Sequence, residues 1–212
     1  MSLKKIIFLG LSLFLITRIF GADVNKIISK VQDKYDNMKY LTATFKQVET
    51  FKITGSQTEN IGKIYIANGN KYRFESEDQV IVTDGKSVWT YNSISKQLLI
   101  DEVRENSGAL IPRDLLFKYP QKYFATLLSE SKENGKKLYL IRLDPKDQVY
   151  GYVKSLKIWV EDDQWLIHKI ESTDVNGNKS VYEITDQDTK SKISEDMFKF
   201  IPGEDTEVVD MR

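Results

Sequence analysis

Between Gly62 and Asp101 the sequence alternates apolar and polar residues in short bursts, which turn-forming residues separate. The breaks are Asn-Gly, Glu-Asp, Asp-Gly and Asn-Ser-Ile-Ser. A period of two with Val, Ile, Tyr, Trp and Phe between such turns is typical of antiparallel strands joined by hairpins. The pattern predicts five strands, at residues 63–67, 71–76, 79–83, 87–91 and 96–101. A meander of this length is expected to curl into a barrel or part of one.

One face of this predicted sheet is expected to be apolar throughout, because aromatic and aliphatic residues recur at every second position. Such a face needs either a covering segment or a ligand. We assign to it one set of side chains: Phe45, from the preceding strand, with Ile64, Ile66, Tyr72, Phe74, Val82, Trp89 and Tyr91.

The segments before the meander change period. Residues 23–37 place Val24, Ile27, Ile28, Val31 and Tyr35 at helical spacing, which predicts an amphipathic helix opened by Asp23 and packed on the sheet. Its polar face is not basic enough for a membrane-surface helix. A long Thr-rich strand is predicted at 41–54, followed by a polar loop at 55–60.

After residue 101 the strand pattern stops, and two very apolar helices are predicted at about 112–118 and 121–129. Pro112 and Pro120 suit the first turn of each helix. These helices either plug one end of a barrel as core or form a movable lid. The lid residues on this interpretation are Leu115, Leu116, Phe124 and Leu127.

The C-terminal third returns to alternation and predicts strands at 136–144, 152–161, 164–173 and 179–185, with one more strand or turn at 194–202. The whole sheet then has ten or eleven strands, which must curl or split. The fold class expected is α+β: a curved antiparallel sheet forming an unclosed half-barrel, with helices covering its concave face.

The N-terminal residues have the layout of a secretory signal peptide. Lys4 and Lys5 precede an apolar run at 6–16, and the small residues Gly21 and Ala22 precede the predicted helix. The run is 11 residues long, whereas a membrane span needs about 20. We expect a signal peptide at 1–22, a single domain at 23–212, and a location in the periplasm.

Composition excludes several classes of function. The 212 residues contain 31 basic and 31 acidic side chains, so no overall charge favours nucleic acid. The chain has no Cys, which excludes thiolate sites and a lipid attached to its own N-terminus. His168 is the single histidine, and its alternation with Leu166 and Ile170 favours a structural role. We therefore expect no metal, no cofactor and no enzyme activity.

Five motifs together resemble the outer-membrane lipoprotein carrier protein (LolA) family. They are Leu-Thr-Ala-Thr-Phe-Lys-Gln at 41–47, Gly-Lys-Ile-Tyr at 62–65, Lys-Tyr-Arg-Phe-Glu at 71–75, Val-Thr-Asp-Gly-Lys-Ser-Val-Trp-Thr-Tyr-Asn at 82–92 and Phe-Lys-Phe-Ile-Pro at 198–202. The resemblance implies an unclosed β-barrel with a helical lid, acting as a monomeric periplasmic chaperone. Its partners would be acylated lipoproteins, an inner-membrane ABC transporter that releases them, and an outer-membrane acceptor.

The sequence departs from the family pattern at one position. Two other functions also remain open. Asn68-Gly69 stands where the family typically has an Arg-Pro pair whose Arg holds the lid closed. The same scaffold could instead be a periplasmic module that senses lipid or lipoprotein. An exported hydrolase is disfavoured, because nucleophile, base and orienting group cannot be assembled around one histidine.

Overall fold

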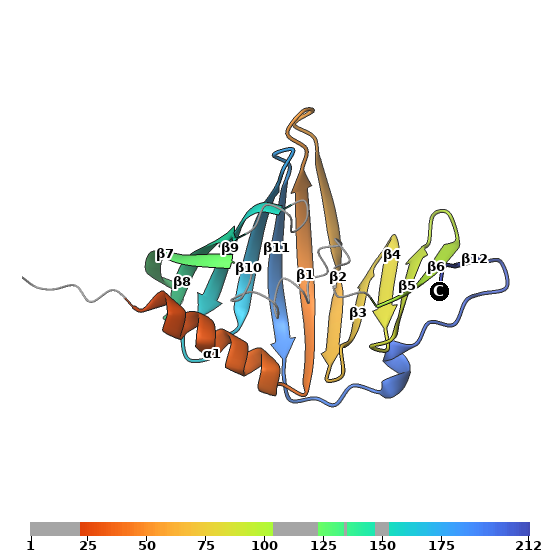
Figure 1. The fold of residues 1–212 in the computed structure, drawn as a ribbon, viewed down its shortest axis with the longest axis horizontal. Coiled ribbons are helices and arrows are strands. Elements are labelled where there is room, and N and C mark those ends of the chain that lie inside the picture. Colours follow the sequence, from red (N-terminus) through yellow and green to blue (C-terminus); the bar gives the residue numbers. More distant parts are fainter. Residues whose placement is uncertain (1–21, 104–122, 134, 147–152) are drawn as a thin grey trace, which may run out of the picture.

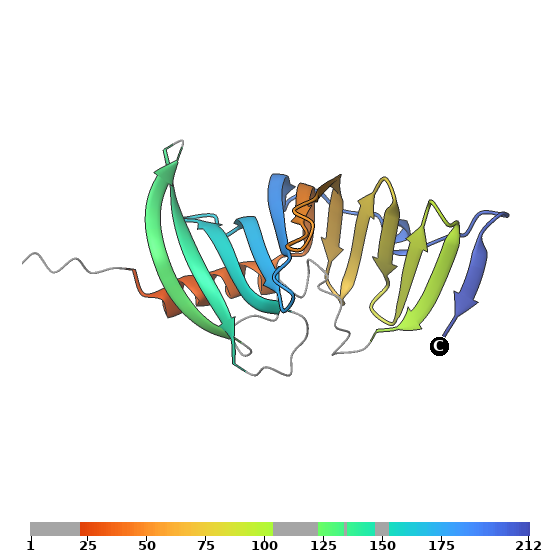
Figure 2. The ribbon, with the colours of Figure 1, turned by 90° about the horizontal axis from the view of Figure 1, so that it is seen from above.

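The computed structural model describes residues 22–103, 123–133, 135–146 and 153–212, and all twelve strands of these residues form one sheet. The strand order is β12-β6-β5-β4-β3-β2-β1-β11-β10-β9-β8-β7. The two edge strands, β12 and β7, lie at opposite ends of the molecule, so the curved sheet does not close (Figures 1 and 2). This confirms the predicted unclosed, curved sheet, which is antiparallel except where β12 pairs with β6.

The predicted meander is present as β2 (Gln57–Ala67), β3 (Lys71–Ser76), β4 (Gln79–Thr83), β5 (Ser87–Asn92) and β6 (Gln97–Glu102), with β3 and β4 at the predicted bounds. The β4–β5 turn is fixed by Asp84, whose Oδ1 accepts hydrogen bonds from the backbone N–H groups of Lys86 and Ser87. Gly85 in this turn has φ +95°, a conformation that glycine adopts without a side-chain clash.

Strand β2 begins six residues earlier than predicted, so the polar loop expected at 55–60 is wrong. The preceding strand, β1 (Tyr40–Thr50), pairs with β2 along its whole length, down to Thr50 opposite Gln57. Backbone hydrogen bonds between the strands hold this extension, and they do not depend on apolar side chains. Alternation of apolar residues could therefore not reveal it.

The C-terminal strands are β8 (Lys136–Pro145), β9 (Val153–Glu161), β10 (Ile167–Asp174) and β11 (Lys179–Asp188), close to the predicted ranges. The helix predicted at 121–129 is wrong. Residues Tyr123–Glu133 form an edge strand, β7, antiparallel to β8. A short apolar run fits either period, and pairing with β8 decides the outcome here. The helix predicted at 112–118 lies outside the described residues.

Helix α1 (Val24–Asn37) confirms the predicted cap and apolar stripe. The Asp23 side chain accepts from the backbone N of Asn25 at 3.0 Å. Ile27, Ile28, Val31 and Tyr35 are buried against the sheet. We call the face of the sheet that α1 covers the inner face and the opposite one the outer face (Figure 1).

After β11 the chain crosses to the outer face. We call residues 189–206 the C-terminal segment. It contains a 3₁₀ turn, η1 (Glu195–Phe198), where one more strand or turn was expected. Figures 1 and 2 show it running along β1 to β5 on the side of the sheet away from α1. The chain then adds strand β12 (Glu207–Asp210), which pairs parallel to β6 and was not predicted.

Candidate functional site: the apolar inner face

The inner face is built from side chains that the strand register places opposite one another. Ala43 of β1 lies opposite Ile64 of β2, which lies opposite Phe74 of β3. One step along, Ile66 lies opposite Tyr72. Because directly opposed residues of antiparallel strands project to the same side, these side chains share one face. All of them are buried.

Phe45 is the centre of this part of the face. Its side chain is fully buried, and its ring stacks on that of Phe74 with centroids 4.2 Å apart. Gly62 lies opposite Phe45 across the β1–β2 pair. A Cβ atom at Gly62 would approach the Phe45 ring to 2.5 Å and the Glu75 carbonyl oxygen to 2.1 Å. Glycine at 62 thus makes the room that the aromatic pair occupies.

The inner face continues across the other half of the sheet, from which our sequence-based set took no residue. Register links Leu127 of β7 to Ile141, Ile141 to Ile158, Ile158 to Ile170, and Ile170 to Tyr182. The Tyr182 ring in turn lies 6.5 Å from Phe45. The apolar surface is therefore continuous from β7 to β3. The alternating pattern of these strands was visible in the sequence, but only the register shows which alternate residues join Phe45.

Helix α1 closes one end of this surface. The buried Tyr35 hydroxyl accepts a hydrogen bond from the backbone N of Ile167 at 3.1 Å. Burial raises the pKa of Tyr35, because its ionised form would lose hydration. Lys30 lies over the Trp165 ring, 4.2 Å from its centroid, and Trp165 stacks on Tyr139 of the inner face. These contacts fix the helix against β8 and β10.

Three residues of the predicted set do not belong to the inner face. Val82 of β4 lies opposite Arg73, and Trp89 lies opposite Val82. Tyr91, two residues along β5 from Trp89, projects to the same side. Arg73 alternates with Tyr72 and Phe74, so all three predicted residues project to the outer face. The expectation that one trough contains the complete set is wrong.

The reason is the turn between β3 and β4, which consists of the two residues Glu77 and Asp78. A two-residue connection pairs an even-numbered residue of β3 with an odd-numbered residue of β4, as in Phe74 with Ile81. The inner face of β4 therefore carries Ile81 and not Val82. This signal was present in the sequence, since the bounds of both strands were predicted correctly.

The outer face has a separate cover, the C-terminal segment. Its residues Ile193 and Phe198 are buried in a small cluster with Ala67 of β2. The Phe200 ring lies 5.0 Å from that of Tyr91. Lys71 of β3 forms an ion pair with Glu195 of η1. The motif at 198–202 thus packs on the outer face.

The four predicted lid residues are not brought together. Leu115 and Leu116 lie outside the described residues. Leu127 is on β7, where it projects to the inner face and packs against the apolar cluster. Phe124 projects to the other side, is 62% exposed, and has the Lys146 ammonium 5.5 Å from its ring centroid. The helical lid is not supported for residues 123–129.

At the position of the expected latch, Asn68-Gly69 forms the turn between β2 and β3. The backbone N of Asn68 donates to the Lys39 carbonyl at 3.3 Å, and Gly69 has φ +76°. The Gly69 carbonyl oxygen lies 2.2 Å from where a Cβ of Gly85 would be, so this turn packs closely on the β4–β5 turn. The Asn68 side chain is exposed.

A charged cluster lies at the end of β8, β9 and β10. His168 Nε2 is 2.6 Å from a carboxylate oxygen of Glu161, which is only 5% exposed and also pairs with Lys136 at 2.9 Å. Among the described residues, no group of three His, Cys, Asp or Glu side chains is arranged to hold a metal ion. His168 therefore lies beside a buried carboxylate that the exposed Lys136 also contacts.

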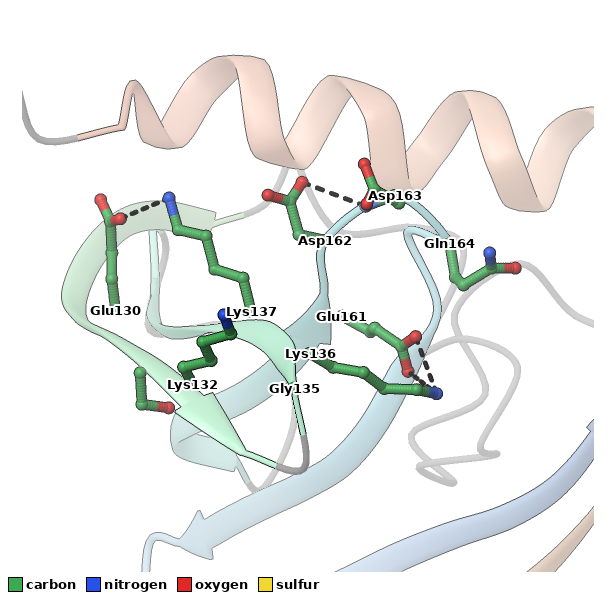
Figure 3. Close-up of a pocket in the computed structure, with 10 residues that line it drawn as sticks. Glu130, Lys132, Gly135, Lys136, Lys137, Glu161, Asp162, Asp163 and Gln164 are labelled. Carbon is green, nitrogen blue, oxygen red and sulfur yellow. Dashed lines mark hydrogen bonds and ion pairs between the residues drawn. The ribbon is translucent and has the colours of Figure 1, made fainter.

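Described residues form two pockets, the first lined mainly by charged side chains and the second by charged, polar and apolar ones. One, of about 620 Å³, lies between the β7–β8 hairpin and the β9–β10 turn, and Figure 3 shows Lys136, Lys137 and Glu161 in its wall. The other, of about 670 Å³, lies beside the C-terminal half of α1 and is lined by Lys34, Lys190 and Trp165 among others. Neither is lined by any inner-face residue of the predicted set. In the described part of the chain, no helix is long and apolar enough to cross a membrane.

Comparisons with known proteins give the family of the chain. An uncharacterized protein of Methanocaldococcus jannaschii is 28% identical over 93% of this chain and 58% of its own length. The outer-membrane lipoprotein carrier protein of Shewanella halifaxensis is 26% identical over 64% of this chain and 61% of its own length. The chain thus spans about three fifths of these two curated relatives.

A solved structure supports the fold. An uncharacterized conserved protein from Thermus thermophilus is 14% identical, with a TM-score of 0.59 over 88% of this chain and 98% of that one. The family model described as outer membrane lipoprotein carrier protein LolA matches residues 36–201, most of the sequence. The chain therefore belongs to the LolA family.

Proposed function

We propose that this protein is a periplasmic chaperone that binds the acyl chains of lipoproteins on its inner face. It would receive them from an inner-membrane ABC transporter and carry them to the outer membrane. Family membership and the names of its relatives support the class of ligand. The observation that carries the proposal is the continuous apolar surface on the inner face of a sheet that does not close.

The chemistry of that surface suits a lipid. Burying each methylene of an acyl chain is worth about 0.8 kcal/mol, so apolar contact alone supplies affinity. The residues proposed to contact the ligand are aromatic or aliphatic, which lets the chain slide and leave without breaking ion pairs. They are Phe45, Ile64, Ile66, Tyr72, Phe74 and Ile81 from β1 to β4, with Leu127 from β7.

Reversible transport needs a protein that exchanges its own contacts for those of the ligand. These inner-face side chains are already buried in the structure. A ligand that enters must therefore displace a covering segment, and its departure must restore the cover. An unclosed sheet has two free ends that can separate, which a closed barrel lacks.

Two adjacent residues of β4 give a matched test. Ile81 and Val80 are both half-buried, but Ile81 projects to the inner face and Val80 to the outer face. In Ile81→Glu a carboxylate meets the acyl chain, and we expect the Kd for an acylated lipoprotein to rise at least about tenfold, since burying an unpaired charge is costly. Val80→Glu should change it less than about twofold. Circular dichroism and thermal melting check that both variants fold.

Transport is tested separately from binding. Lipoprotein newly made in spheroplasts should be released into the medium when the wild-type protein or Val80→Glu is added, and not with Ile81→Glu. Equal binding by the two variants would show that the inner face is not the ligand site. Normal binding without release would leave a lipid-binding protein and refute the carrier role.

A further inference from the structure

We propose that the signal peptide is cut between residues 21 and 22, and that Glu130 of β7 holds the new amino terminus of Ala22. The sequence alone places this boundary only approximately, since both Gly21 and Ala22 are small residues that suit the position before a cut. The structure distinguishes the two sites, because the two mature chains would make different contacts.

Ala22 is already tied to the sheet. Its backbone N donates a hydrogen bond to Glu130 Oε1 at 2.9 Å, across 108 residues of sequence. Ala22 is half-buried, and its side chain packs against the inner-face cluster. A residue of the mature protein is expected to make such contacts, and a residue of the discarded leader is not.

The carboxylate of Glu130 is placed where it can bind a cation at residue 22. Register places Glu130 opposite Tyr139 of β8, on the inner face near the start of α1. The Lys137 ammonium pairs with one oxygen of Glu130 at 2.6 Å (Figure 3). The other oxygen accepts the hydrogen bond from Ala22. Lys137 also lies 4.8 Å from the centroid of the Tyr139 ring, so it is attracted to that ring as well as to Glu130. Cutting would turn the neutral amide donor into an ammonium, whose hydrogen bond to a carboxylate is stronger.

A cut after Ala22 would lose these contacts. The new ammonium would then belong to Asp23, the residue that caps α1 through its bond to Asn25. The first turn of a helix carries unpaired N–H groups and a partial positive charge, which repels a cation. The structure therefore favours Ala22, one residue before the helix cap, as the first residue of the exported protein.

The covalent step is an ordinary hydrolysis by a membrane-bound signal peptidase. The bond between the Gly21 carbonyl carbon and the Ala22 nitrogen breaks. Water supplies a hydroxyl to the carbonyl carbon and a hydrogen to the nitrogen. The resulting amine takes a further proton from solvent and becomes the cation that Glu130 binds.

The first experiment measures the intact mass of the protein exported from cells that express the full chain. A mass corresponding to residues 22–212 is expected. A chain that starts at Asp23 or at any other residue, or an uncut chain, would overturn the proposed site.

The second experiment tests the ion pair itself in purified protein. Glu130→Gln is made in a chain that starts at Ala22 and in one that retains Gly21, where the Ala22 nitrogen is a neutral amide. The substitution removes the contact with Lys137 in both chains, so this loss cancels when their two changes in Tm are compared. We expect Glu130→Gln to lower the Tm about 2 °C more in the chain that starts at Ala22.

The matched control is Glu133→Gln, an exposed carboxylate three residues along the same strand. Its effect on the Tm should be the same in both backgrounds. If Glu130→Gln also has equal effects in the two backgrounds, Glu130 does not bind the terminal ammonium.

Discussion

Two regions of the same sheet bury opposite faces. In β1–β3 and β7–β11 the buried apolar residues, apart from Ala67 of β2, project to the inner face, where α1 packs. In β4–β6 the buried apolar residues are Val82, Leu98 and Ile100, which project to the outer face. The strands of the two regions are hydrogen-bonded neighbours and have similar composition. What differs is the segment that lies over each face.

Apolar–polar alternation therefore identifies which residues of one strand share a face, but it does not show which residues of the next strand lie on that face. A two-residue turn shifts the pairing so that even-numbered residues of β3 lie opposite odd-numbered residues of β4. An apolar set that is continuous in the sequence is thereby divided between two faces. On the proposed function the inner face carries the ligand, while on the outer face the protein's own C-terminal segment contacts β2, β3 and β5.

The largest expected effect is at the centre of the inner-face region. Phe45→Ala removes a fully buried ring that stacks on Phe74, and it should lower the free energy of unfolding by about 3–5 kcal/mol. Urea denaturation followed by circular dichroism measures this. A loss below about 1 kcal/mol would show that the ring is not part of the main core.

A smaller effect is expected at the matching residue of the outer face. Phe198 is 1% exposed, but among the described residues its cluster has only two other buried members, Ala67 and Ile193. Phe198→Ala should cost about 2 kcal/mol, because the C-terminal segment can relax into the gap. Hydrogen exchange should speed up in the C-terminal segment and β12 and stay unchanged in β8–β10.

The two Phe substitutions also test whether the regions unfold together. If Phe198→Ala destabilises the whole protein as much as Phe45→Ala, the outer face is not a separate layer. The contrast between the two regions would then fail.

The smallest expected effect concerns pH and sharpens the description of the inner face. Burial raises the pKa of Tyr182 to about 12, because its phenolate would be poorly hydrated beside Phe45. In the unfolded chain the Tyr182 phenol ionises near pH 10. Its contribution to the free energy of unfolding is therefore complete below pH 10 and is lost as the pH rises toward 12. At pH 11 the loss from this residue is about 1.4 kcal/mol.

Unfolding free energies of wild type and Tyr182→Phe at pH 9 and pH 11 measure this loss. The variant should lose about 1.4 kcal/mol less than wild type between these pH values. Burial also raises the pKa of Tyr35, Tyr123 and Tyr139 in the same region, so a residual loss is expected in the variant. Identical pH slopes would mean that the Tyr182 side chain is hydrated.

Local signals in the sequence determined much of this protein. The bounds of β3 and β4, the Asp23 cap of α1 and the helical stripe through Tyr35 followed from periodicity and turn chemistry. These features depend on residues a few positions apart, so neighbouring side chains suffice to specify them. The motifs that indicated the LolA family are also local, and the family model confirms the family.

Only the tertiary structure decided which residues of the C-terminal strands share a face with Phe45 and where the sheet ends. Register placed Ile158, Ile170 and Tyr182 on the inner face, pairing with β8 made residues 123–133 a strand, and β12 pairs with β6. Each of these outcomes depends on hydrogen bonds to another strand. A short segment that can satisfy its backbone groups in more than one way takes its conformation from its partner, which its own sequence does not contain.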